Sequence, residues 1–169
     1  MAILSTLLMI GIPIAMAWFW LNFDSNIESV SIYNEGILQA DTIVTWQVIT
    51  AGSFSVLSAL IFAYGLYQLR KLFINFTARE YFTQPNLECM YRFSLILFVS
   101  ATLKLFDTAV MSLVLTWNNP PGERALSITF GTNQFWSLFI AATFLAITWS
   151  FREGVELAKE NAEFIWALL

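Results

Sequence analysis

The chain has 169 residues, of which 58% are hydrophobic and only 12% charged, which is the composition of a membrane protein rather than of a soluble domain. Its net charge of -4 argues against nucleic acid as a partner, because no basic face is present to neutralise phosphates. With no histidine and a single cysteine, Cys89, the chain lacks the commonest metal ligand and general base and has no second thiol for an internal disulfide.

Four apolar stretches predict membrane-spanning helices, and the first covers residues 3–21. A helix of this length measures about 28 Å, enough to cross a bilayer core of about 30 Å. Ala15-Met16-Ala17 resembles a signal-peptide cleavage site, but the basic segment that should precede it is missing. We therefore expect a retained helix rather than a signal peptide.

The second span, residues 43–69, follows a polar segment that contains acidic residues but no Lys or Arg. Small residues recur in this span at every fourth position, namely at Ala51, Ser55, Ala59 and Ala63. Such spacing lets another backbone approach closely and predicts a helix-packing face, either inside the protein or between two copies. Apolar residues continue at helical spacing beyond residue 69, so the helix is expected to extend past the membrane surface.

The third span, residues 91–117, has ionisable side chains, Lys104 and Asp107, at its centre. A charged group in hydrocarbon costs roughly 2.5–3.5 kcal/mol unless it finds a partner or water. The two residues are three positions apart and can pair, while Lys104 is too far from either surface for its side chain to reach water. Ser100 and Thr108 extend the polar stripe, so these four residues predict an intramembrane polar site that faces the bundle interior.

Two interpretations of this polar site remain open. In the structural one, Lys104 and Asp107 neutralise each other and fix the packing of the helices. In the functional one, they line a wet cavity and handle a proton, an ion or an anionic ligand. The structural interpretation is favoured, because a single Lys–Asp pair without further carboxylates makes a poor proton relay.

The connection between the second and third spans, residues 70–92, contains four of the eight Lys and Arg residues. Thr83 and Pro85 within it predict the start of the next helix, as N-cap and first-turn proline. A connection rich in Lys and Arg is expected in the cytoplasm, which places both termini there as well. Five tryptophans then fall at the outer ends of the spans, as an interfacial belt requires: Trp18, Trp20, Trp46, Trp117 and Trp136.

The fourth span, residues 134–151, follows a turn-forming stretch of Asn, Pro and Gly. The remaining residues, 152–169, have an apolar face opposite a row of glutamates, which predicts a short amphipathic cytoplasmic tail helix. Because an acidic face opposes binding to anionic lipid, we expect the tail to contact protein. The residues predicted for cytoplasmic contacts are Arg70, Lys71, Arg79, Glu156 and Glu160.

Three segments resemble a bacterial family of membrane proteins, domain of unknown function 2975. They are Glu80-Tyr81-Phe82-Thr83, Asn119-Pro120-Pro121-Gly122-Glu123-Arg124 and Glu153-Gly154-Val155-Glu156-Leu157-Ala158-Lys159-Glu160-Asn161. The resemblance implies a four-span inner-membrane protein, sometimes encoded beside a small helix-turn-helix regulator. It implies no catalytic or ligand-binding residues.

The sequence thus predicts an all-α, four-span transmembrane helix bundle that forms one integral membrane domain of residues 1–169. We expect neither enzymatic activity nor a cofactor, because the chain has no triad histidine, no zinc-binding cluster and no phosphate loop. The favoured hypothesis is an inner-membrane accessory or regulatory protein that contacts another membrane or cytoplasmic protein; the resemblance suggests a helix-turn-helix regulator. The alternative is a small oligomeric transporter or sensor for an ion or solute that uses Lys104 and Asp107.

Overall fold

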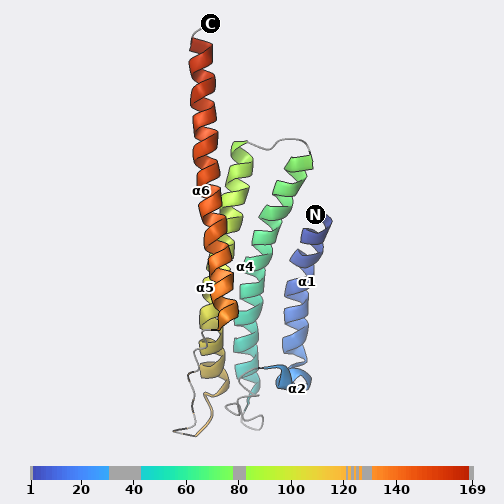
Figure 1. Ribbon diagram of the computed structural model, residues 1–169. Helices are drawn as coiled ribbons and strands as arrows, with labels where there is room; N and C mark the ends of the chain where they lie inside the picture. The colour runs from blue at the N-terminus through green and yellow to red at the C-terminus, as the bar shows by residue number, and fades with distance from the viewer. Residues whose placement is uncertain are drawn as a thin grey trace.

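Four long helices dominate the computed structural model, which describes residues 2–30, 43–77, 83–120, 122, 124, 126 and 131–167, with side chains described up to residue 156. They are α1 (Ala2–Leu21), α4 (Thr45–Thr77), α5 (Gln84–Leu115) and α6 (Thr132–Ala167), and they run alternately in opposite directions (Figure 1). A short helix, α2 (Phe23–Asn26), and a 3₁₀ turn, η1 (Ile27–Ser29), follow α1. No strand occurs in the described part of the chain, and the predicted all-α class is confirmed.

All four long helices have the length and apolar composition needed to cross a membrane. With 33 and 32 residues, α4 and α5 measure about 50 and 48 Å, well beyond a bilayer core of about 30 Å. The predicted extension of the second span is confirmed, since α4 continues to Thr77. Thr83 is the N-cap residue of α5 and Pro85 lies in its first turn, as expected, although the Thr83 side chain makes no capping hydrogen bond.

Each long helix packs mainly against its neighbours in the chain, α1 on α4, α4 on α5 and α5 on α6. Two glycines of α4 allow α1 and α5 to approach α4 closely. A Cβ atom on Gly52 of α4 would lie 3.1 Å from the Trp20 side chain of α1, and one on Gly65 would lie 2.9 Å from Ile96 of α5. The helices α1 and α6 form the two ends of the row and remain largely exposed.

The two ends of the bundle differ in their side chains. Four exposed tryptophans lie where α1 and α5 finish and α4 and α6 begin, namely Trp18, Trp46, Trp117 and Trp136, and a further one, Trp149, lies near the opposite end. We call the end with the four tryptophans the tryptophan end. The opposite end, where α4 finishes and α5 begins, has the basic residues Arg70, Lys71, Arg92 and Arg152 and is called the basic end.

The tail is continuous with the fourth span instead of forming a separate helix. α6 runs without interruption from Thr132 to Ala167, about 54 Å, and projects beyond the basic ends of α4 and α5 (Figure 1). The only residue in this stretch that disfavours a helix strongly is Gly154, which costs about 1 kcal/mol relative to alanine. Because no proline follows Gly154 and the surrounding residues favour helix, α6 continues past it.

Candidate functional site

The polar residues predicted at the centre of the third span are divided between two environments. Lys104 is exposed, whereas Asp107 is partly buried, and the structure shows no ion pair between them. Helical side chains lean toward the N-terminus of their helix, and a cation placed before its carboxylate is the less favourable order for a helical pair. Within the described part of the chain, the ion pair that does form joins Arg92 and Glu88 at the basic end.

Asp107 and Thr108 line a cavity of about 280 Å³ between α1, α4 and α5. Ser55 of α4 adds a second hydroxyl to its lining. The rest of the lining is apolar or comes from the end of η1: Met16, Phe19, Trp20, Ser29, Val30, Met111 and Leu115. Asp107 forms no hydrogen bond with any described residue, so its carboxylate is available to a ligand or to water in this cavity.

Ser100 and Lys104, the other members of the predicted polar site, do not line this cavity. The Ser100 hydroxyl oxygen is buried and has no hydrogen-bond partner among the described residues. The structure therefore brings only Asp107 and Thr108 of the predicted four together around one space. Ser55 joins them from the predicted packing face.

The predicted small-residue face of α4 is buried inside the single chain. Ala51 and Ser55 are 0% and 6% exposed, and Ala59 and Ala63 are 6% and 7% exposed. Ala51 belongs to a core cluster with Phe23, Met111 and Leu115. This face therefore packs α4 against its own neighbours and is not a free surface for a second copy.

The predicted cytoplasmic contact residues lie at the basic end where they are described. Lys71 and Glu156 are exposed and Arg70 is partly exposed, with no ion pair among these three. Arg79 lies outside the described residues, as does the side chain of Glu160.

Sequence reasoning missed a buried polar cluster at the tryptophan end, centred on Gln47. Its side chain is 0% exposed, and its Nε2 donates to the backbone oxygens of Val114 and Leu115 at 2.9 and 3.0 Å. Its Oε1 accepts from the backbone N–H of Val44 at 2.8 Å and from Asn118 Nδ2 at 3.0 Å. Gln47 thus provides a donor for the Leu115 carbonyl and a further one for the Val114 carbonyl, which also accepts from the backbone N–H of Trp117, and it ties α4 to α5.

Two further polar contacts join neighbouring helices. Asn75 Nδ2 donates to Asn86 Oδ1 at 2.6 Å and links α4 to α5 at the basic end. The Ser94 and Thr148 hydroxyls are 2.9 Å apart and link α5 to α6. A buried polar side chain in an apolar helix needs a hydrogen-bond partner. The presence of such residues in apolar stretches is the only sequence feature that could have indicated these contacts.

Comparison with known families gives one finding. The model of the family described as "Protein of unknown function (DUF2975)" matches residues 38–165, which include α4, α5 and nearly all of α6. No curated protein and no solved structure matches the chain. The matched region contains the Lys104 and Asp107 positions but not α1, which supplies one wall of the cavity.

Proposed function

Because the chain belongs to the DUF2975 family, we propose that it is a non-enzymatic accessory or regulatory protein of a bacterial inner membrane. It works through contacts with another protein, with the basic end and both termini in the cytoplasm. The family description names no activity, so the proposal is argued from the exposed residues of this chain. A helix-turn-helix regulator is a candidate partner by resemblance alone, which is an associational argument.

The exposed position of Lys104 is the observation that supports this proposal. Lys104 lies about 18 Å from Arg92 and about 20 Å from Trp117 along α5, so its ammonium group does not reach either surface. Exposure to hydrocarbon would cost roughly 2.5–3.5 kcal/mol. A polar or acidic group on another protein offsets this cost when it covers Lys104.

The helical position of Lys104 points to the same conclusion. Phe93, Met111 and Leu115 are 11, 7 and 11 positions away from it, close to whole numbers of turns, and all three are buried. Lys104 therefore shares the packing side of α5, yet at its depth no element of the described chain covers it. The uncovered part of a packing face is suited to a helix of another protein.

We expect the substitution Lys104→Met to release the partner. The tagged protein, purified in mild detergent from its native host, should retain one protein at stoichiometric amounts, and mass spectrometry should show about tenfold less of it with Lys104→Met, equivalent to about 1.4 kcal/mol of binding. Arg152→Met, which removes an exposed cation at the basic end that is not among the predicted contact residues, should keep the partner. Purification of a homogeneous protein without any partner would contradict the proposal.

A second candidate function, transport or sensing, is favoured by the Asp107 cavity. The Asp107 carboxylate, which has no hydrogen bond to a described residue, lines the cavity with the Ser55 and Thr108 hydroxyls and the Trp20 ring, and these are suitable groups for a small cation. In this function, several copies of the chain form an oligomer, and Lys104 contributes to the surface that contacts the ion or solute.

We expect the double variant Lys104→Met, Asp107→Leu to fold normally but to lose ion or solute flux in liposomes by at least about tenfold, or about 1.4 kcal/mol. Asp24→Asn, which changes an exposed carboxylate on α2, is the matched control and should behave as the unmodified protein. Flux by the pure protein that disappears with Lys104→Met would favour this function over the accessory one. Unchanged behaviour of the double variant would exclude a working role for the cavity.

A further inference from the structure

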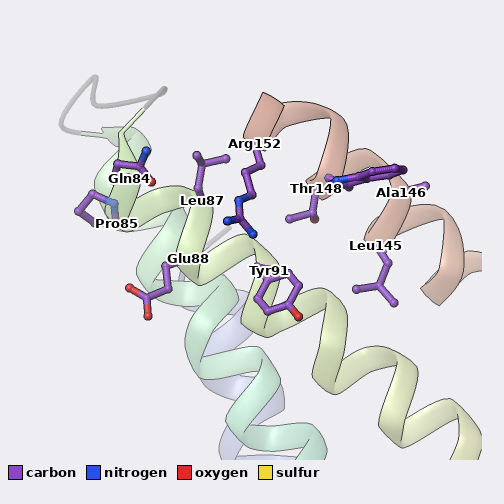
Figure 2. Close-up of a pocket in the computed structure, with 10 residues that line it drawn as sticks. Gln84, Pro85, Leu87, Glu88, Tyr91, Leu145, Ala146, Thr148 and Arg152 are labelled. Atoms are coloured by element: carbon purple, nitrogen blue, oxygen red, sulfur yellow. The ribbon is translucent and has the colours of Figure 1, made fainter. Parts of the chain in front are cut away.

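A second cavity, of about 710 Å³, lies between the first turns of α5 and the middle of α6 at the basic end (Figure 2). Its lining includes the apolar residues Leu87 of α5 and Leu145 and Ala146 of α6. Tyr91 and Arg152 also line it. None of these residues belongs to the polar site or to the contacts proposed above.

The charges around this cavity leave one cation without a counterion. Arg152 is exposed and forms no ion pair or hydrogen bond with any described residue. Figure 2 shows its side chain extending from α6 toward α5, above Tyr91, whereas Glu88 points away from α6. Glu88 is paired with Arg92, so its carboxylate does not neutralise Arg152.

The depth of the cavity matches a membrane interface. Arg152 lies at the basic end, where the apolar part of α6 finishes, and Tyr91 and Trp149 are of the type that favours headgroup level. Ala146 and Leu145 lie about 9 and 10.5 Å from Arg152 along α6, toward the membrane centre. A cationic group therefore stands above an apolar wall, in the order in which a phospholipid places its phosphate and acyl chains.

We propose that this cavity binds one anionic phospholipid molecule. The Arg152 guanidinium donates two hydrogen bonds to headgroup phosphate oxygens, a geometry that a planar guanidinium supports better than an ammonium group. Leu145 and Ala146 contact an acyl chain. Basic pockets between transmembrane helices commonly hold anionic headgroups in this way. The site goes beyond the proposed function, since it requires neither a protein partner nor Lys104.

The test measures lipid binding by the full-length protein in detergent, by native mass spectrometry with added phosphatidylglycerol or phosphatidylcholine. We expect the unmodified protein to hold one phosphatidylglycerol at least about tenfold more tightly than phosphatidylcholine. Arg152→Gln should remove this preference, and Arg152→Lys should restore part of it. Lys71→Gln, which removes an exposed cation at the same end but outside the cavity, should leave the preference unchanged.

A second variant tests the apolar wall independently. Ala146→Phe places a ring in the cavity and should weaken phosphatidylglycerol binding about tenfold, although Arg152 is retained. Equal binding of the two lipids by the unmodified protein, or an unchanged preference in Arg152→Gln, would overturn the proposal. So would equally tight binding of soluble glycerophosphoglycerol, because a headgroup alone would then suffice.

Discussion

Replacing Gln47 with methionine is expected to lower the free energy of unfolding by about 3 kcal/mol. Methionine nearly preserves the volume of the side chain but makes none of its four hydrogen bonds. The carbonyls of Val114 and Leu115 and the backbone N–H of Val44 would each lose the partner that Gln47 provides. The bond to the Leu115 carbonyl is buried, and an unsatisfied buried backbone group is especially costly in a membrane protein.

Thermal unfolding in a mild detergent, supported by titration with a denaturing detergent, measures this loss. Gln84→Met is the matched control, because Gln84 is exposed at the start of α5, and its stability should change by less than about 0.5 kcal/mol. Equal losses for the two variants would show that the hydrogen bonds of Gln47 contribute nothing specific. A normal stability of Gln47→Met would mean that α5 ends with its carbonyls satisfied in another way.

The four long helices could be predicted because each contains an apolar stretch long enough to cross a bilayer. The bilayer requires such apolar stretches whichever helices pack against one another, so they can be recognised without knowing the helix contacts. The helix ends were harder to place, since hydrogen bonding along a helix continues into water. α4 ends at Thr77 and α5 begins at Gln84, several residues beyond the apolar stretches that predicted them.

The partners of the polar side chains could not be predicted from the sequence. Lys104 and Asp107 are close in the chain, which suggested a pair, but the position of α1 and α4 gives Asp107 a cavity and leaves Lys104 uncovered. Gln47 resembles an ordinary polar residue near the end of a span. Its hydrogen bonds reach residues 67 and 68 positions away, and local patterns contain no information about such contacts.

The lining of the Asp107 cavity was also only partly predictable from the sequence. Its hydroxyl and carboxylate groups come from positions that the sequence singled out, Ser55, Asp107 and Thr108. Its α1 wall consists of Met16, Phe19 and Trp20, which are unremarkable in an apolar helix. The presence of a cavity therefore depends on how closely α1 approaches α4, and one glycine controls that distance.

Replacing that glycine, Gly52, with leucine is expected to displace α1 from α4 and to remove the cavity. A Cβ atom alone would lie 3.1, 3.2 and 3.3 Å from three atoms of the Trp20 side chain, which leaves no room for the rest of leucine. Trp20 is also stacked on Phe23, with ring centroids 5.1 Å apart. We therefore expect a loss of about 1–3 kcal/mol in the free energy of unfolding, as for other overpacked sites.

The matched control is Gly11→Leu on the exposed surface of α1, where a Cβ atom meets nothing within 4 Å. It should leave stability nearly unchanged, because it adds an apolar group to a surface that faces lipid. Thermal unfolding compares the two variants, and the flux or ligand response assigned to Asp107 should be lost only in Gly52→Leu. If Gly52→Leu kept both its stability and the response, Trp20 would not be part of a working cavity wall. A loss of the response together with retention of the Lys104-dependent partner would instead separate the two proposed functions.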